Sequence, residues 1–194
     1  MYKKIIIIAV AVIFAGLYSL YLDGEHDNQF TPSTALKAQI ELVENLPVAQ
    51  FKFVGKARLS DGDSLQFAGE AMRVRLFAID SPELAQECSK NQQNWQCGQA
   101  AKQALQQRID GGEVSCVGDE KDRYERLLAT CYLTMKDGKY LDLNAWQVKN
   151  GWAIAYVYYS KRYVSEQKFA KKQKLGIWQG SFLEPFKWRQ QNNR

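Results

Sequence analysis

Two short apolar runs joined by Gly69-Glu70 constrain the fold of this chain more than any other feature. The first run, Ser64–Ala68, follows an Asp61-Gly62-Asp63 turn, and the second, Ala71–Ile79, ends at Asp80. Apolar and polar residues alternate along the second run, as they do in a β-strand with two distinct faces. A tight turn between two strands makes an antiparallel hairpin. We therefore expect the acidic ends of the two runs to meet at one edge of a sheet.

The register of this hairpin predicts a metal site. Pairing about the turn matches positions whose numbers sum to roughly 140, so Asp63 lies opposite the end of the second run and close to Asp80. Neighbouring carboxylates repel each other unless a cation lies between them. Oxygen ligands without His or Cys suit a hard ion such as Ca²⁺ or Mg²⁺, and the only histidine, His26, lies far from this stretch. The proline after Ser81 favours an extended backbone that turns the Ser81 carbonyl towards the same ion.

Each of these features also has an ordinary structural explanation. Asp-Gly-Asp is usually a plain turn, Ser-Pro-Glu is usually the start of a helix, and an arginine in a strand, such as Arg75, usually faces solvent. Their concentration at one end of a single hairpin favours a functional site.

The remaining patterns predict one barrel. Further strand patterns cover Phe51–Leu59, Glu113–Val117 and Leu127–Met135, and helical patterns cover Gln99–Ile109, Leu143–Asn150 and Tyr163–Lys174. Trp152–Tyr158 is expected to be extended, and the tail Phe182–Trp188 is expected to pack on the domain through its aromatic residues. This order is that of a five-stranded Greek-key barrel of the OB type. The expected fold class of residues 51–194 is α+β, mainly β, with three packed helices.

An N-terminal hydrophobic helix precedes this domain. Lys3 and Lys4 come before an uncharged run, Ile5–Leu22, which is long enough to span a bilayer and lacks a clear cleavage site. The positive charges place this end in the cytoplasm and the rest of the chain outside it. Residues 1–22 are therefore expected to be a signal-anchor, or a signal peptide if they are cleaved. The protein is then extracytoplasmic, either membrane-anchored or secreted or periplasmic. Residues 23–50 are predicted to be a tether with a short helix at Thr34–Glu44.

The four cysteines favour two disulfides. Cys88 and Cys97 bracket a polar loop, whereas Cys116 and Cys131 lie in two strands on either side of a charged turn, where antiparallel pairing would place them opposite each other. A four-cysteine zinc site lacks the expected C-x-x-C spacing, and free buried thiols are the other alternative. Export supports the pairs 88–97 and 116–131.

The charge distribution favours a polyanionic partner. Residues 160–194 hold nine Lys or Arg against two Glu, while the whole chain has a formal charge of +5. A basic face near an acidic cluster suits a nucleic acid that must also meet a metal. A solvated helix face is the alternative explanation. No obligate protein partner is evident, and a monomer is expected.

Four spaced motifs together resemble the staphylococcal nuclease (thermonuclease) family. They are Asp61-Gly-Asp-Ser64, Arg75-Leu-Phe-Ala-Ile-Asp80-Ser-Pro-Glu83, Asp122-Arg-Tyr-Glu-Arg126 and Ala155-Tyr-Val-Tyr158, followed by Gly176-Ile-Trp178. The resemblance covers about Phe51 to Gln179. It implies a Ca²⁺-dependent phosphodiesterase on an OB barrel that cuts DNA and RNA and leaves 3′-phosphorylated ends.

The resemblance also implies a role for each matching residue. Asp63, Asp80 and the Ser81 carbonyl are similar in position to the calcium ligands, and Glu83 is similar to the general base. Arg75 and Arg126 resemble the two arginines that hold the phosphate. Tyr156 and Tyr158 resemble the tyrosines of the nucleotide pocket, although simple packing would also explain them.

One residue departs from the family pattern. Glu125 stands where the family usually has glycine, so a backbone with φ > 0 and a carboxylate near the phosphate are expected there. This departure favours the alternative of a non-catalytic OB-fold module that binds single-stranded nucleic acid at the cell envelope. A structural envelope protein with a vestigial barrel is a third alternative.

Overall fold

The computed structural model describes residues 42–192. The predicted hydrophobic helix, the tether and most of the predicted Thr34–Glu44 helix lie outside these residues. Its last part, Leu42–Val43, forms strand β1, so the helix prediction is wrong there. Pairing of β1 with another strand, β11, overrides the helical spacing of the apolar residues. Within residues 42–192, no helix has the length and apolar character that a bilayer span requires.

The domain is built on one large sheet of eight strands. They are β1 (Leu42–Val43), β2 (Phe51–Gly55), β3 (Ala57–Leu59), β4 (Ser64–Phe67), β5 (Arg73–Leu76), β9 (Val114–Lys121), β10 (Leu127–Thr134) and β11 (Tyr140–Asp142). Strand β10 pairs antiparallel with β9 and β11 and parallel with β5. The hairpin β4–β5 continues to β3, and β9 also pairs with β2. The mainly-β α+β class is confirmed, and the arrangement fits an OB-like fold.

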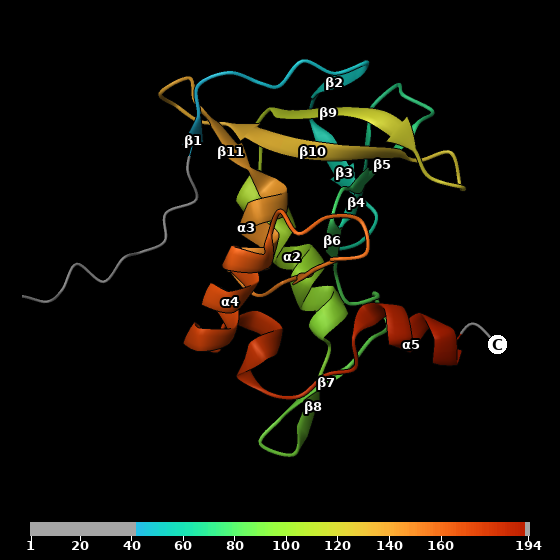
Figure 1. The fold of residues 1–194 in the computed structure, drawn as a ribbon, viewed down its shortest axis with the longest axis vertical. Helices are drawn as coiled ribbons and strands as arrows, with labels where there is room; N and C mark the ends of the chain where they lie inside the picture. The colour runs from blue at the N-terminus through green and yellow to red at the C-terminus, as the bar shows by residue number, and fades with distance from the viewer. Residues whose placement is uncertain (1–41, 193–194) are drawn as a thin grey trace, which may run out of the picture. The chain divides into compact units, whose positions relative to one another are not determined.

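Smaller elements complete the chain. Two two-stranded sheets join β6 (Ile79–Asp80) to β12 (Ile154–Ala155) and β7 (Cys88–Lys90) to β8 (Gln93–Trp95). The helices are α2 (Cys97–Ile109), α3 (Leu143–Lys149), α4 (Val164–Gln173) and α5 (Pro185–Asn192), with a 3₁₀ turn, η1, at Gly176–Gln179. The described part of the chain therefore has four α-helices instead of the three predicted, because the tail itself forms α5. Figure 1 shows α2, α3 and α4 gathered on one side of the large sheet.

Two predicted strands are interrupted. The expected strand Phe51–Leu59 breaks after Gly55, whose φ of 148° is not accessible to other residues without strain. The expected strand Ala71–Ile79 breaks at Phe77-Ala78, where Ala78 has φ 60°. The second break separates β5 from β6, so that β6 leaves the large sheet and pairs with β12. Only two residues of the predicted extended stretch Trp152–Tyr158 form a strand.

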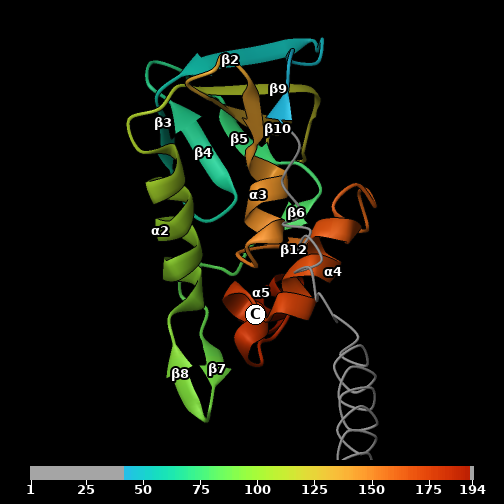
Figure 2. The same ribbon diagram turned by 90° about the vertical axis from the view of Figure 1, so that its left-hand side faces the viewer.

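Both predicted disulfides are present. Cys116 and Cys131 face each other across the β9–β10 pair, as the strand register predicted. The bond between Cys88 and Cys97 joins the start of the β7–β8 hairpin to the first residue of α2. Figure 2 shows this hairpin projecting beyond the end of α2, away from the large sheet.

The core has two parts. The main cluster lies between the large sheet and helices α2 and α3, and it includes Leu65, Val74, Leu105, Leu127 and Val148. A second, smaller cluster surrounds the Cys88–Cys97 bond and contains Ile154 and Ile177, with Trp95, Trp178 and Phe182 packed against it. The main cluster fixes the sheet, and the smaller one attaches the C-terminal part of the chain.

Candidate active site

The β4–β5 hairpin brings its two acidic ends together. Ser64 lies opposite Arg75 in the antiparallel register, and the Leu76 amide donates to the Asp63 carbonyl at 2.8 Å. Gly62, in the turn before β4, packs so closely on Ser81 that a Cβ at this position would collide with the serine hydroxyl. The turn that opens the hairpin and the segment that follows it are therefore in contact, as the sequence predicted.

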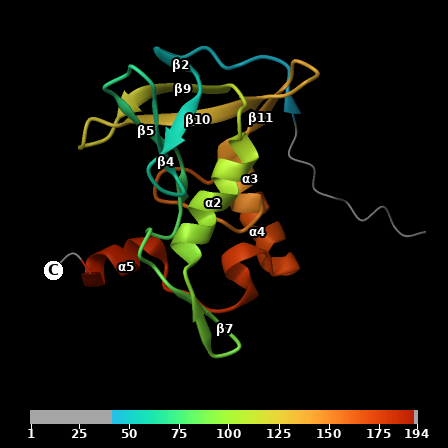
Figure 3. The same cartoon turned by 180° about the vertical axis from the view of Figure 1, so that it is seen from behind.

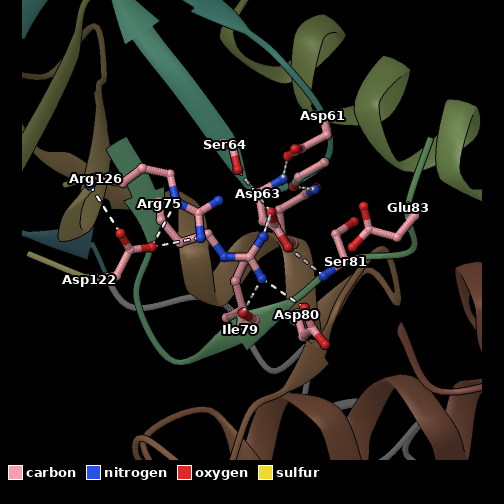
Figure 4. Close-up of polar contacts among 12 residues, drawn as sticks. Asp61, Asp63, Ser64, Arg75, Ile79, Asp80, Ser81, Glu83, Asp122 and Arg126 are labelled. Carbon is pink, nitrogen blue, oxygen red and sulfur yellow. Dashed lines mark hydrogen bonds and ion pairs between the residues drawn. The ribbon is translucent and has the colours of Figure 1, made fainter. Parts of the chain in front are cut away.

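One guanidinium group joins the two predicted metal carboxylates. Arg75 pairs with Asp63 through Nη1, and its Nη2 donates to Asp80 Oδ1 at 2.7 Å (Figure 4). Both carboxylates are almost fully buried, with 1% of Asp63 and 0% of Asp80 exposed. Two buried carboxylates need compensating charge, and in this structure the Arg75 side chain supplies part of it.

Burial lowers the pKa of the Arg75 guanidinium, and the negative charges of Asp80 and Asp61 offset part of this effect. The side chain stays charged at neutral pH because arginine begins with a very high pKa. Asp61 itself accepts a hydrogen bond from the Asp63 amide at 2.9 Å, which closes the turn. Asp61 therefore shapes the loop that carries Asp63.

Ser81 contacts the site through its amide and its hydroxyl. The amide donates to Asp63 Oδ2 at 2.6 Å, and the hydroxyl donates to the Trp152 carbonyl at 2.8 Å. These two bonds fix the Asp63 carboxylate and link it to the chain just before β12. The proposed role of the Ser81 carbonyl as a metal ligand stays a prediction.

Glu83 lies at the same site but has an unforeseen partner. Its carboxylate accepts a hydrogen bond from Arg189 Nη1 at 2.7 Å, and about a third of the side chain, 31%, is exposed. Arg189 belongs to α5 and also donates to both oxygens of Asp80, at 2.9 and 3.1 Å. Burial opposes the charge of Arg189, but the hydrogen bonds and charges of Asp80 and Glu83 outweigh it and raise the pKa of the guanidinium.

Arg126 approaches the site from the turn between β9 and β10. Because β10 runs parallel to β5, with Leu128 beside Arg75, the residue that precedes β10 lies near Arg75. Asp122 holds the Arg126 side chain by accepting from Nε at 2.7 Å and from Nη2 at 2.6 Å. In Figure 4, Arg126 and Glu83 lie on either side of the group that contains Asp63, Arg75 and Asp80.

Glu125 adopts the conformation that the family comparison predicted for glycine. Its φ is 60°, in the left-handed region. The side chain is 81% exposed and pairs with Lys121 at 3.2 Å, and the expectation of a carboxylate near a bound phosphate stays a prediction. Its charge is therefore directed to solvent, and the backbone of the turn keeps Arg126 in position.

Aromatic side chains extend from β12. The rings of Tyr156 and Tyr158 lie 6.0 Å apart, and Tyr159 packs against both, with ring centres 5.3 and 5.5 Å away. Burial and the nearby charge of Asp80 raise the pKa of Tyr156, whereas Tyr158 is 82% exposed. The segment presents one tyrosine beside the carboxylates and others to solvent, a surface on which bases can stack.

The residues fit a hard divalent cation held mainly by oxygen and water. Within residues 42–192, no group of three or more His, Cys, Asp or Glu side chains is arranged to hold a metal ion. Asp63 and Asp80 nevertheless bind the two terminal nitrogens of one guanidinium, so their carboxylates face the same small region of the site. Ca²⁺ and Mg²⁺ accept such oxygen ligands and complete their coordination with water. Asp63 and Asp80 would hold the ion.

Three buried amide side chains form hydrogen bonds with the backbone segments that carry the site residues. Gln147 of α3 donates to the Gly62 carbonyl at 2.6 Å, and Asn144 donates to the Phe77 and Ala129 carbonyls at 3.0 and 3.1 Å. Gln86 accepts from the Glu83 amide at 3.2 Å and donates to the Leu183 carbonyl at 2.6 Å.

Sequence reasoning missed all three amide side chains and the contact of Arg189 with the site. Asn144 and Gln147 lie in α3 and Gln86 lies in the segment before β7. They donate to carbonyls that are distant in the sequence, and a lone polar residue gives no local signal of such a partner. For Arg189, the only signal in the sequence was the excess of Lys and Arg in residues 160–194, which does not indicate its partners.

The sequence model of the family described as "Staphylococcal nuclease homologue" matches residues 73–180. This range begins with β5 and contains Asp80, Glu83 and Arg126, while Asp63 precedes it. Residue Arg189 and most of the C-terminal tail lie beyond it.

Individual proteins are also similar to this chain. A micrococcal nuclease from Shigella flexneri is 32% identical over 167 residues, which cover 80% of this chain and 90% of that protein. An uncharacterized endonuclease from Haemophilus influenzae is 32% identical over 140 residues, covering 69% and 71%. The succinoglycan biosynthesis protein ExoI from Rhizobium meliloti is 34% identical over 128 residues, 64% of each chain. The match thus spans just under two thirds of the rhizobial relative.

Proposed function

This chain belongs to the staphylococcal nuclease family, and we propose that it is a calcium-dependent endonuclease that hydrolyses DNA and RNA with little sequence preference. The observation that carries the proposal is the meeting of Asp63, Asp80 and Arg75, with Glu83 and Arg126 on either side. The proposed products carry 3′-phosphates. The proposed location is extracytoplasmic, on an N-terminal anchor, or secreted or periplasmic if that segment is cleaved.

The arginines would bind the phosphodiester. Guanidinium groups bind phosphate oxygens in a bidentate manner. Arg75 lies in β5, and Arg126 directly precedes the neighbouring strand β10. Fixed positive charge in a site with little water stabilises the charge that develops on the phosphate oxygens. Tyr156 and Tyr158 would stack on the bases next to the scissile bond, which requires no particular sequence.

Glu83 would act as the general base. It would take a proton from a water molecule whose oxygen forms the new bond to phosphorus, while the bond from phosphorus to the 5′ oxygen breaks. The phosphate stays on the 3′ side, and the 5′ oxygen leaves as a hydroxyl after it takes a proton from solvent. A bound Ca²⁺ supplies Lewis-acid polarisation of a phosphate oxygen and lowers the pKa of bound water.

The substitution Glu83→Gln tests this proposal. It keeps the size of the side chain but removes the base, and we expect the cleavage rate to fall by about 10² to 10⁴. Cleavage of labelled DNA and RNA is measured with Ca²⁺ and with a chelator. Glu70→Gln, at the exposed turn of the same hairpin, is the control of matched charge. Unchanged cleavage in Glu83→Gln, or cleavage that survives the chelator, would contradict the mechanism.

The same assay separates catalysis from binding alone. A purified protein that binds oligonucleotides in millimolar Ca²⁺ without shortening them would favour the non-catalytic single-strand-binding module. Glu125 was the residue that suggested this alternative, and its carboxylate is paired with Lys121 at the surface.

A further inference from the structure

Arg189 occupies the two groups that the proposed reaction needs free. Its Nη1 bridges Asp80 Oδ1 and Glu83 Oε1, at 2.9 and 2.7 Å, and its Nη2 donates to Asp80 Oδ2 at 3.1 Å. A single side chain thus holds the proposed metal carboxylate and the proposed base together. With Arg75 also on Asp80 Oδ1, every oxygen of the Asp80 carboxylate is engaged by a guanidinium.

A divalent cation cannot share Asp80 with Arg189 in this arrangement. The cation would need at least one oxygen of the Asp80 carboxylate, and it would then lie within a few ångströms of a guanidinium that carries the same sign of charge. Like charges at that distance repel strongly in a buried site. Arg75 extends from a strand paired on both sides, whereas Arg189 extends from a terminal helix with one buried residue, so Arg189 is the cation that we expect to move.

The C-terminal helix is attached in a way that permits this movement. Pro185, in its first turn, is its only buried residue. The segment before it is held by the Leu183 carbonyl, which accepts from Gln86, and by Phe182, whose ring lies 4.8 Å from that of Trp178. Figure 3 shows α5 extending from this attachment away from α4 and β7. Beyond the first turn, Arg189 is the residue that ties the helix to the carboxylates.

The same helix also covers a proposed substrate residue. The Phe186 ring lies 6.4 Å from that of Tyr156, and Phe186 is 42% exposed. A helix that moves away from Asp80 would therefore also uncover Tyr156. The contacts of Phe186 and Arg189 place one face of α5 over the carboxylates and the nucleotide-binding tyrosine together.

We propose that α5 is an autoinhibitory element in which Arg189 competes with the divalent cation for Asp80 and masks Glu83 until the cation displaces it. This inference rests on the proposed function, because it takes Asp80 to be a ligand of the ion. The apparent affinity for Ca²⁺ is then reduced by the fraction of molecules in which α5 is bound to the carboxylates.

Calcium binding to the full chain tests the competition. Isothermal titration with Ca²⁺ should give a dissociation constant about tenfold lower in Arg189→Gln than in the wild type, as expected if the helix is bound in about nine of ten metal-free molecules. Lys187→Gln is the matched control, because it removes the same charge from the same helix, and within residues 42–192 Lys187 pairs only with Glu184. Arg189→Lys keeps the charge and loses the bidentate contact, so its Ca²⁺ affinity should lie between those of the wild type and Arg189→Gln.

Hydrogen exchange of the wild-type protein provides a second measurement. Addition of Ca²⁺ should accelerate exchange of the α5 amides after Pro185, while exchange in β4 and β5 stays the same or slows. A purely electrostatic effect of residue 189 on the ion would leave α5 exchange unchanged. Equal Ca²⁺ affinity in Arg189→Gln and Lys187→Gln, or α5 amides that slow when Ca²⁺ binds, would overturn the proposal.

The two proposals fail in different ways. If the wild type takes up no Ca²⁺ and cleaves no nucleic acid, the proposed function is wrong, and so is the competition. If the wild type binds Ca²⁺ and cleaves, but Arg189→Gln matches Lys187→Gln in affinity, only the autoinhibitory role of α5 is wrong.

Discussion

Arg75 and Arg189 bind the same carboxylate, but they come from regions of very different construction. Arg75 lies in β5, which pairs with β4 on one side and β10 on the other, and 15% of its side chain is exposed. Arg189 lies in a short terminal helix with one buried residue, and 29% of its side chain is exposed. Arg75 therefore belongs to the central sheet, whereas Arg189 belongs to a helix on the surface of the domain.

This difference suggests that the positive charge of Arg75 stays beside Asp80, whereas that of Arg189 can move away from it. Withdrawing the Arg75 side chain would leave Asp63 and Asp80, which are both buried, without part of their compensating charge, which is costly. Moving Arg189 breaks three part-buried hydrogen bonds and leaves the sheet intact. A site that must hold a phosphate needs the first kind of arginine, and a site that must also admit a cation can use the second.

Among substitutions of the arginines, the largest expected effect is that of Arg75→Lys. A lysine cannot bridge Asp63 and Asp80 or bind a phosphate in the bidentate manner of a guanidinium. We expect the cleavage rate to fall by about 10² to 10³, while circular dichroism shows a folded protein. Arg73→Lys, an exposed position two residues earlier in the same strand, is the control.

The comparison is sharpened by placing Arg189→Lys beside Arg75→Lys. If Arg189 contacts Asp80 mainly in the metal-free protein, Arg189→Lys should change the cleavage rate at saturating Ca²⁺ by less than tenfold. Its main effect should be on the Ca²⁺ concentration that gives the half-maximal cleavage rate. A loss as large as that of Arg75→Lys would show that the helix arginine is as essential as the strand arginine, and the distinction between the two regions would be lost.

The region of Arg75 was largely predictable from the sequence. Three local signals were present: the turn at Gly69-Glu70, the alternation along the second strand and the acidic residues at both ends. Side chains alternate between the two faces of a strand, so these signals together predict which residues lie opposite each other in the hairpin. Ser64 lies opposite Arg75, as that register requires. The Cys116–Cys131 bond followed from the same reasoning about paired strands.

The region of Arg189 was not predictable in the same way. Its tail was expected to pack through aromatic residues, but neither α5 nor the contact with Asp80, 109 positions away, has a local signal. The hydrogen bond from Gln86 to Leu183 also joins residues 97 positions apart. Such contacts depend on how the chain returns to the domain after α4, which a single sequence does not specify.

One disulfide lies in the large sheet and the other in the small cluster that attaches the C-terminal segment. Removing each one should therefore affect a different region. Replacing Cys116 and Cys131 with serine opens a cross-link across the central strands and should lower the free energy of unfolding by about 3 kcal/mol, as estimated for a 15-residue loop. Replacing Cys88 and Cys97 removes a bond that encloses a shorter loop, with a separation of 9, in the cluster that holds Phe182.

We expect the second double mutant to lose less global stability but to exchange α5 amides faster. Urea unfolding and hydrogen exchange measure these two quantities on the same proteins. Equal protection of α5 in both double mutants would indicate that the C-terminal segment is fixed by the main core, contrary to the comparison.

A smaller effect is expected at Gln147. This fully buried side chain of α3 donates to the Gly62 carbonyl, which lies in the turn that carries Asp63. Gln147→Leu keeps the volume but leaves the carbonyl unpaired, at a cost of about 1–3 kcal/mol in urea unfolding. Gln107→Leu, on the exposed face of α2, should change stability by no more than about 0.5 kcal/mol. A Gln147 variant as stable as this control would show that the turn is held by the hairpin alone.

The smallest expected effect concerns the third arginine, Arg126, which is supported by Asp122 of its own turn. Burial raises the pKa of the Asp122 carboxyl, but hydrogen bonds from the Arg126 side chain and from the Arg126 and Tyr124 amides outweigh burial and lower it. A carboxyl whose pKa is lower in the folded state stabilises the fold above its unfolded pKa, about 4, and loses this contribution as the pH falls through the folded value.

Asp122→Asn should therefore destabilise the protein by about 1 kcal/mol at pH 7. The difference from the wild type should shrink as the pH falls below about 4. Asparagine still offers an oxygen to the Tyr124 and Arg126 amides, so the variant removes mainly the charge that holds the guanidinium. Urea unfolding at pH 7 and at acidic pH measures the difference. A constant difference would assign the role of Asp122 to the turn backbone, and the charge of Asp122 would then not be what holds Arg126.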